Sequence, residues 1–277
     1  MAEIRHKTII RLSDKDIVAI DYKPVKPQIV YHYTNIEVLK IILSTQKLRL
    51  TNLRMLSDKS EYMHGLNLLI KGISDYEYLL GIEPRYQIPR KFYDKVFFPD
   101  DLYTICFTEN GDDFNFWNSK YVGTAQPIAI GFRYNDLRND NIILNRCGYG
   151  DSLPSKVDDR IYKLVRNIYT CNYTEDEKYL FIHLTHELAH FKKKAFSSEN
   201  EWRFITPDTS RNQRTKNKYI HVDINLNSIA EIVIGGGVNI PRNHELVEKI
   251  IEQYRINPDI INSSVPFYPN PTSNERR

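Results

Sequence analysis

Short runs of apolar and β-branched residues occur along the chain between longer stretches in which apolar residues recur every three or four positions. The short runs predict strands, which lie at residues 28–33, 47–53, 102–110, 127–132, 200–206, 219–224 and 229–238. The longer stretches predict helices, which lie at residues 35–46, 57–80, 175–196 and 242–254. A short helix is expected at residues 114–122, two short strands within residues 8–22, and another strand near the end of residues 160–173.

The predicted strands and helices follow one another irregularly, without a strict alternation. This order favours an α+β fold over a parallel α/β sheet. One main domain is expected at residues 29–268, preceded by an N-terminal strand extension at residues 1–28. Residues 269–277 are polar and are expected to form a frayed tail.

The composition is that of an ordinary globular protein and points to the cytoplasm. Of the 277 residues, 41% are apolar and 26% are charged, and the net charge of +3 is too small and diffuse to indicate nucleic-acid binding by itself. No apolar run approaches the ~20 residues that span a bilayer. Residues 1–16 lack the apolar core of a signal peptide. The three cysteines are far apart and form no CxxC pair, so neither a disulfide framework nor a cysteine-based zinc site is expected.

Residues 186–190 read HELAH and match the zincin pattern, in which two histidines on one helix face bind zinc and the glutamate polarises a water molecule. His183, His186 and His190 are predicted on an outward face of the helix, away from its apolar stripe. That stripe consists of Leu180, Phe181, Leu184, Leu188, Phe191 and Ala195. We therefore expect a solvated helix face and no metal, with a zinc hydrolase as the alternative.

The junction between the first main strand and its helix is rich in polar residues. Thr34, followed by Glu37 three positions later, forms a capping box that starts a helix. Capping does not account for His32. Alternation along the strand places His32 on one face and both Tyr31 and Tyr33 on the other. His32 is either a hydrogen-bonded structural residue or part of a site.

A second polar group lies in the predicted strand at residues 200–206. Glu199, Glu201 and Arg203 project to one side, whereas Trp202 and Phe204 project to the other. Such a row differs from an ordinary buried strand. It indicates either a functional site or an exposed edge strand with a Glu–Arg pair that contributes little to stability.

A third polar group follows the strand at residues 102–110. This strand ends in Phe107 and Thr108, and an acidic turn leads from it into the predicted short helix. Trp117 and Tyr121 stand four positions apart on one face of that helix. These aromatic rings would either clamp a flat ligand or pack against the protein core.

These stretches, in this order, resemble the bacterial family known as domain of unknown function 2971. The matching motifs are residues 31–34, 48–61, 106–132, 199–203 and 229–235, so that the resemblance covers residues 29–255. Two motifs differ from the family pattern, with Ser57-Asp58 in place of Asn-Asp and Cys106-Phe107-Thr108 in place of Ser-Phe-Ser. HELAH is not part of that pattern. Members of the family are often found among bacterial defence-associated genes.

The same pattern is more distantly similar to ADP-ribosyltransferases. The resemblance implies an α+β domain with a mixed or antiparallel split sheet flanked by helices, and NAD as substrate. In those enzymes a first strand carries His or Arg beside Thr, a second strand carries Ser or Thr, and a glutamate on a late strand completes the site. His32 would hydrogen-bond a ribose. The residues in corresponding order here are His32, Thr34, Asn35, Thr108, Glu199 and Glu201.

The resemblance also implies a role for each remaining residue. Glu201 would stabilise the positive charge that develops when the bond between nicotinamide and ribose breaks. Tyr33 or Tyr121 would stack on the nicotinamide ring. Arg54 or Arg203 would contact the pyrophosphate. The implied catalytic residues are Glu201, Glu199 and His32, and the implied NAD-binding residues are Tyr33, Thr34, Asn35, Arg54, Thr108, Trp117, Tyr121 and Arg203.

The sequence therefore favours an ADP-ribosyltransferase-like toxin or phage-defence effector that transfers ADP-ribose to a macromolecule or hydrolyses NAD. The acceptor is either protein or nucleic acid, and a partner protein of a defence system is also expected. Two alternatives remain open. One is a non-enzymatic sensor or binding module. The other is a metal-dependent, nuclease-like hydrolase that uses Asp58, Glu61, Glu199 and Glu201.

Overall fold

The computed structural model describes residues 26–56, 59–81, 102–117, 126–139, 142–152, 159, 161–163, 166, 189–207, 218–235 and 240–265. The strands expected within residues 8–22 and near the end of residues 160–173 lie outside these ranges. So do Tyr121 and the first part of the helix expected at residues 175–196. The domain limits at residues 29 and 268 stay predictions.

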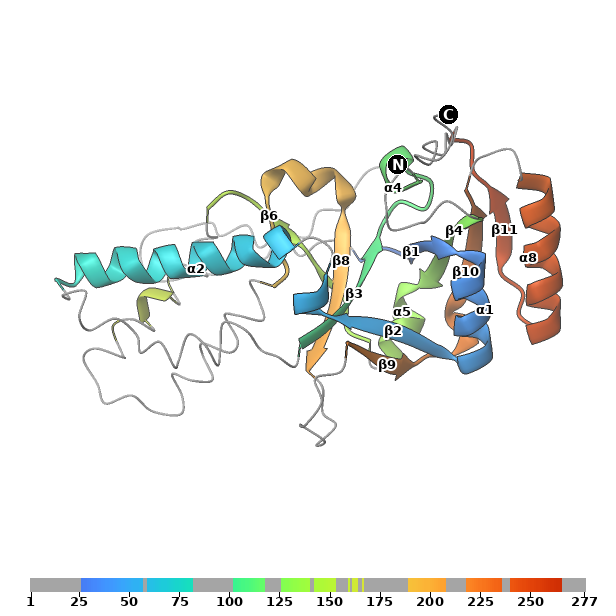
Figure 1. The fold of residues 1–277 in the computed structure, drawn as a ribbon, viewed down its shortest axis with the longest axis horizontal. Coiled ribbons are helices and arrows are strands. Elements are labelled where there is room, and N and C mark those ends of the chain that lie inside the picture. Colours follow the sequence, from blue (N-terminus) through green and yellow to red (C-terminus); the bar gives the residue numbers. More distant parts are fainter. Residues whose placement is uncertain are drawn as a thin grey trace, which may run out of the picture.

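Nine strands of the described chain form one mixed sheet (Figure 1). Along its main path the order is β11 (Asp259–Asn262), β10 (Ile229–Ile234), β4 (Pro127–Arg133), β1 (Ile29–Asn35), β3 (Leu102–Thr108), β2 (Lys47–Asn52) and β9 (Tyr219–Asp223). β8 (Glu201–Pro207) pairs with β3, and β5 (Asn145–Arg146) pairs with β8. β10 and β11 run parallel and the other pairs are antiparallel. A separate parallel pair consists of β6 (Gly148–Tyr149) and β7 (Phe191–Lys192).

Helices complete an α+β fold. Those with described bounds are α1 (Ile36–Thr45), α2 (Lys59–Leu79), α4 (Phe114–Trp117), α5 (Tyr134–Asn139) and α8 (Ile240–Tyr254), together with the 3-10 turns η1 (Leu53–Met55), η3 (Lys194–Glu199) and η4 (Leu226–Ser228). α1 and α8 lie side by side, whereas α2 extends away from the sheet (Figure 1). Among the described residues, none of the helices combines the length and apolarity that crossing a membrane requires.

The sheet divides at β3. β8 follows one edge of β3 along its whole length. On the opposite edge, β1 meets β3 at the Tyr31–Thr108 pair, whereas β2 meets it at Thr104 and Tyr103. β1 and β2 therefore diverge along the same edge, and residues 105–107 lie between the two ladders. The sheet is split at this point, as the resemblance implied.

One face of both sheet halves forms the main apolar core. α1, α5 and α8 cover this face with Leu39, Leu137 and Val247, all 0% exposed. The burial of such side chains is the main favourable term in folding. Because this core receives residues from every central strand, it holds the two sheet halves together. Its sheet residues include Val30, Leu50, Ile105, Phe107, Ile130, Phe204 and Ile232.

The opposite face has two contrasting parts. Over β1, β4 and β10 it carries a small aromatic cluster of Tyr33, Trp117, Ala129 and Val233. Over β3 and β8 it carries buried polar side chains, which are Thr104, Thr108, Glu201 and Arg203. Buried charged groups are rare unless they are paired. This polar half is therefore the part of the fold that calls for a functional explanation.

Most predicted elements are present, and three differ from the structure. The helix expected to continue to residue 196 is absent from residue 189 onward, where a turn, β7 and η3 follow one another. Residues 134–149, for which no helix or strand was predicted, contain α5, β5 and β6. β11 was not predicted, although its residues DIIN pair with β10 in parallel register.

The start of α1 also differs from the prediction. Asn35, not Thr34, is the N-cap, because its side-chain oxygen accepts a hydrogen bond from the Val38 N–H at 3.0 Å. Thr34 belongs to β1 and is buried. Glu37 instead pairs with Lys40 on the exposed side of α1 at 2.8 Å. The capping box Thr34–Glu37 was therefore wrong, and the cap lies one residue later.

Replacement of the N-cap tests this assignment. Asn35→Ala should cost about 1 kcal/mol, because the Val38 N–H loses its partner. Glu37→Gln should change stability by less than about 0.5 kcal/mol, since it removes only an exposed ion pair. Urea unfolding of both variants checks the prediction. An equal loss in the two variants would restore Glu37 to the cap.

Candidate active site

One row of residues crosses the sheet on its polar and aromatic face. Glu201 stands opposite Thr108, and Thr108 stands opposite Tyr31. Tyr31 in turn faces Gly131, which faces Glu231. Directly opposed residues in neighbouring strands point to the same side. Glu201 and Tyr31 therefore share a face, and the Tyr31 hydroxyl donates a hydrogen bond to Glu231 at 2.7 Å across Gly131.

Gly131 leaves room for the Tyr31 ring. A Cβ atom at Gly131 would lie 2.9 Å from this ring, and one at Gly111 would lie 2.4 Å from it. Contacts this short cannot be accommodated without movement of the ring or the backbone. The two glycines therefore fix the ring of Tyr31 on the sheet beside Thr108.

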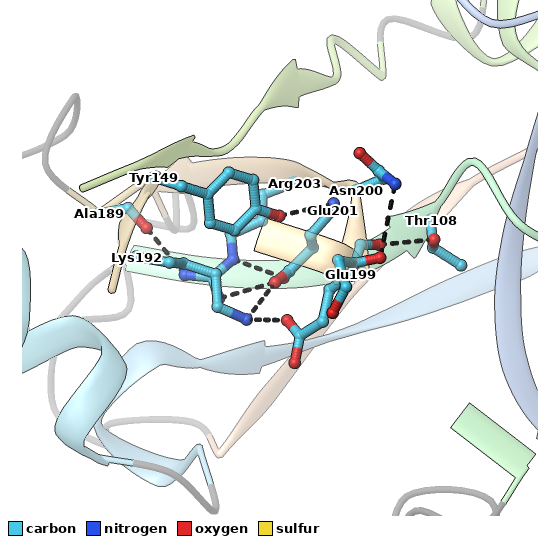
Figure 2. A network of polar contacts seen from close by, with 9 residues as sticks. Thr108, Tyr149, Ala189, Lys192, Glu199, Asn200, Glu201 and Arg203 are labelled. Carbon is cyan, nitrogen blue, oxygen red and sulfur yellow. Dashed lines mark hydrogen bonds and ion pairs between the residues drawn. The ribbon is translucent and has the colours of Figure 1, made fainter. Parts of the chain in front are cut away.

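Glu201 is the centre of a buried ion network at the start of β8 (Figure 2). The Arg203 guanidinium contacts both of its carboxylate oxygens, with Nε–Oε1 at 2.6 Å and Nη2–Oε2 at 3.3 Å. The Lys192 ammonium lies 2.6 Å from Oε2 and also contacts the Glu199 carboxylate. The side chains of Lys192, Arg203 and Glu201 are 2%, 1% and 8% exposed. Two cations thus neutralise two carboxylates, as buried charges require.

Backbone contacts fix this network in place. The Glu201 N–H donates to the Tyr149 hydroxyl at 2.8 Å, and the Glu201 carbonyl accepts from the Cys147 N–H at 2.8 Å. The Thr108 hydroxyl donates to the Glu199 carbonyl at 2.7 Å. The backbone of Glu201 is therefore held by the segment that contains β5 and β6, and the backbone of Glu199 is held by Thr108 of β3.

The charges set the protonation state of Glu201. Burial alone would raise its pKa, but the Arg203 guanidinium and the Lys192 ammonium outweigh burial and lower the pKa to about 2. Burial raises the pKa of the Cys106 thiol well above its usual range, and the Glu201 charge adds to this effect. Glu201 is therefore an ionised, rigidly held carboxylate beside a protonated thiol.

The structure decides between two interpretations of the segment at residues 199–206. β8 is not an exposed edge, because it lies between β3 and β5. Glu201 and Arg203 share one face and Trp202 and Phe204 the other, as predicted. Glu199 ends η3 rather than lying on the strand, and its side chain is 30% exposed. The Glu–Arg pair is thus a buried contact and not a weak surface pair.

His32 does not join Glu201. It neighbours Tyr31 in β1, so it points to the opposite face of the sheet, where its ring lies 5.8 Å from that of Phe107. Its Nδ1 is 2.9 Å from the Cys106 carbonyl. A carbonyl only accepts, so Nδ1 carries the proton. The implied catalytic set, in which His32 acts together with Glu201, is therefore wrong for His32, which bridges β1 and β3 where the sheet splits.

Arg203 is also placed differently from the predicted pyrophosphate contact. Its Nε and Nη2 bind Glu201, and its Nη1 donates to the Ala189 carbonyl at 2.9 Å. At 1% exposure the guanidinium is enclosed by these groups. Its role is to hold Glu201, and a phosphate could reach it only by displacing a buried carboxylate.

Two of the aromatic residues expected to bind NAD, Trp117 and Tyr33, pack against the protein instead. Trp117 is fully buried, and its Nε1 donates to Asp112 at 2.7 Å. Tyr33 stacks on Phe116 and contacts the edge of Trp117, with ring centroids 4.8 and 4.6 Å away. Its hydroxyl donates to the Asn110 carbonyl at 3.0 Å and accepts from the Asp113 N–H at 2.8 Å. Together they fix the turn after β3.

The remaining predicted site residues have other positions. Thr34 is buried in β1, and Asn35 caps α1. Arg54 lies in η1, with its side chain outside the described atoms. Of the HELAH motif, only Ala189 and His190 are described, and both are buried. The outward face predicted for His190 is therefore wrong. The zinc alternative at His186 lies outside the described residues.

Within the described ranges, no three His, Cys, Asp or Glu residues gather closely enough to hold a metal ion. Glu199 and Glu201 approach one another, but Lys192 occupies the space at which a divalent ion would bind them. The chemistry of this pair is that of carboxylates held by protein cations.

Sequence reasoning missed three residues of the site. Lys192 was part of a predicted solvated helix, but it is 2% exposed in β7. Tyr149 lies in a stretch for which no helix or strand was predicted, and Tyr31 was treated only as a strand residue. The position of Lys192 next to apolar Phe191 was a weak signal that its side chain is buried. The contact of Lys192 with Glu201 depends on the pairing of β6 with β7.

No family model matches the sequence, and no curated protein matches it either. The resemblance to domain of unknown function 2971 therefore stays a prediction. Solved structures of DarT from Thermus sp. 2.9 have a weakly similar fold. The complex with ADP-ribosylated ssDNA has a TM-score of 0.37 at 13% identity and covers 87% of this chain and 97% of that chain. The complex with NAD+ has a TM-score of 0.37 at 12% identity and covers 88% and 99%. Likeness at this level carries no conclusion about the present chain.

Proposed function

We propose that this protein cleaves NAD between nicotinamide and ribose and passes ADP-ribose to a macromolecule or to water. The observation that carries the proposal is the pair Glu199 and Glu201, joined at the sheet face by Lys192. Glu201 is ionised, buried and held by Arg203, and Glu199 is partly exposed beside it. Both glutamates follow Thr108 in the sequence, as the resemblance to ADP-ribosyltransferases implies, and the Thr108 hydroxyl donates to the Glu199 carbonyl.

The chemistry needs a fixed negative charge. As the C1′–N1 bond breaks, nicotinamide leaves with the bonding electron pair, and the ribose becomes a cation resembling an oxocarbenium ion. A preorganised carboxylate stabilises this charge, because it needs no reorganisation during the reaction. Glu201 would supply that charge and accept a hydrogen bond from a ribose hydroxyl.

Glu199 would then serve the acceptor. A hydroxyl, amino or water nucleophile forms its bond to C1′ and must lose a proton. Glu199 is the more exposed of the two carboxylates and can receive that proton as general base. NAD is thus a substrate of the proposed reaction, and the step requires no redox partner.

The biological setting rests on the sequence resemblance. Families of this pattern are often found among bacterial defence-associated genes, so we propose a toxin or phage-defence effector in the cytoplasm, with a defence protein as partner. The acceptor would be a protein or a nucleic acid.

Labelled NAD tests the proposal. The protein is incubated with cell extract and NAD labelled in the adenylate part, and the protein, RNA and DNA fractions are separated. We expect label in one fraction or free ADP-ribose, with EDTA present or absent. Protein heated with NAD should also show a higher melting temperature, which Mg²⁺ and Zn²⁺ should not produce. Stabilisation by a divalent ion, with activity that EDTA removes, would favour the hydrolase instead.

A further inference from the structure

Lys192 is an unusually placed cation. Lysine is seldom fully buried unless it is paired, and the Lys192 side chain is 2% exposed. β6 and β7 hold its backbone, because Tyr149 stands opposite Lys192 and the Gly150 N–H donates to the Lys192 carbonyl at 3.0 Å. The His64 ring from α2 stacks on Phe191 and contacts the Gly150 carbonyl at 2.8 Å. β6 and α2 thus hold the segment that carries Lys192 in place next to Glu201.

Lys192 and Arg203 contact the carboxylates of the site in different ways. Arg203 contacts both oxygens of Glu201 and so satisfies that carboxylate from within the same strand. Lys192 reaches Glu201 from β7 and also binds Glu199, whose side chain is 30% exposed. The ammonium is therefore the group through which the buried carboxylate and the accessible carboxylate are held together.

We propose that Lys192 is a positioning residue of the site, which holds the partly exposed carboxylate of Glu199 against the buried carboxylate of Glu201. The inference rests on the proposed function for its role in the reaction, but the charge coupling itself can be measured without NAD. Without Lys192, the Glu199 and Glu201 carboxylates would lose the cation that they share, and their like charges would repel one another.

The groups around Glu201 set the direction of the effect. Arg203 from β8 and Lys192 from β7 favour the ionised form, whereas Cys106 from β3, Tyr149 from β6 and the carboxylate of Glu199 from η3 do not supply positive charge. Loss of a nearby cation raises the pKa of a carboxylate. A group whose pKa is depressed in the folded state stabilises the protein above its unfolded pKa, and this stability is lost as pH falls. Loss of Lys192 must therefore move acid destabilisation to higher pH.

Lys192→Met keeps the length of the side chain and removes its charge. The melting temperature is measured between pH 3 and pH 8 without NAD. The acid limb of this profile, in which the melting temperature falls as the pH decreases, should lie about one pH unit higher than in the wild type. Lys192→Arg should restore much of the profile. Lys194→Met removes an exposed charge two residues away and should leave the profile unchanged. Identical profiles for Lys192→Met and the wild type would overturn the proposal.

A second variant covers the case in which Lys192→Met does not fold. Glu199→Gln leaves Lys192 to Glu201 alone and removes a like charge, so its acid limb should move to lower pH. An unmoved or raised limb would contradict the coupling. With NAD, the acid limb of kcat/KM should follow that of stability in Lys192→Met. A wild type that never cleaves NAD would refute the proposed function, while the stability profiles would still decide whether Lys192 holds the carboxylates.

Discussion

Glu201→Gln should lower the rate of NAD cleavage by about 10²–10³-fold, comparable to the loss of other preorganised electrostatic groups. Glutamine keeps the volume and most of the hydrogen-bonding reach of glutamate but lacks its charge. Because this charge matters most in the transition state, NAD binding should largely survive. The measurement is kcat and the dissociation constant of NAD, on protein shown to be folded.

The same change should also weaken folding. On an exposed edge strand, which was one interpretation of the sequence, loss of Glu201 would hardly affect stability, but the side chain is 8% exposed and lies between two buried cations. Glu201→Gln should therefore cost about 3 kcal/mol, since it leaves Arg203 and Lys192 without their shared carboxylate. Glu37→Gln, at an exposed pair on α1, is the matched control. Full activity in folded Glu201→Gln protein would exclude Glu201 from the chemistry.

Arg203→Met should produce the largest loss of stability. Removing one member of a buried ion pair costs about 3–5 kcal/mol, because the other charge is left uncompensated. For a chain of this size such a loss lowers the melting temperature by roughly 6–20 °C. Arg133→Met is the control, since Arg133 is 51% exposed and its pair with Asp136 is 4.0 Å long. It should change stability by about 1 kcal/mol or less.

A double variant distinguishes the ion pair from simple packing. If Arg203 acts through Glu201, the combined loss in Glu201→Gln with Arg203→Met should be smaller than the sum of the two single losses. Additive losses would show that the two side chains stabilise the fold independently. The acid limb should also respond, because without Arg203 the pKa of Glu201 rises from about 2 towards its ordinary value of 4.5. Stability would then be lost at a higher pH.

The strands could be predicted well because each one arises from a local alternation of apolar and polar residues. Alternation in the segments that became β1, β3 and β8 reflects one face packed in the core. The same alternation predicted that Glu201 and Arg203 share a face. The alternation could not show whether His32 lies on the same sheet face as Glu201 and Arg203, because that depends on the pairing of Tyr31 with Thr108. Register between distant strands is set by the whole sheet.

The site depends still more on contacts between distant segments. Lys192 and Glu201 meet because β7 pairs with β6, a two-residue ladder that leaves almost no trace in the sequence. Helical spacing at residues 175–196 favoured a continuous amphipathic helix, and tertiary pairing overrode that local preference at residue 189. The start of α1 was predicted one residue too early, at Thr34 instead of Asn35. Thr and Asn are both good N-caps, and only the end of β1 decides between them.

Nicotinamide release from NAD by the purified wild-type protein tests the central claim most directly. Free nicotinamide is quantified over time in EDTA, with cell extract added as a source of acceptor in a parallel reaction. If the protein cleaves NAD as proposed, nicotinamide is released in at least one of the two reactions, at a rate that EDTA does not change. Absence of nicotinamide in both reactions, or release that EDTA abolishes, would contradict it.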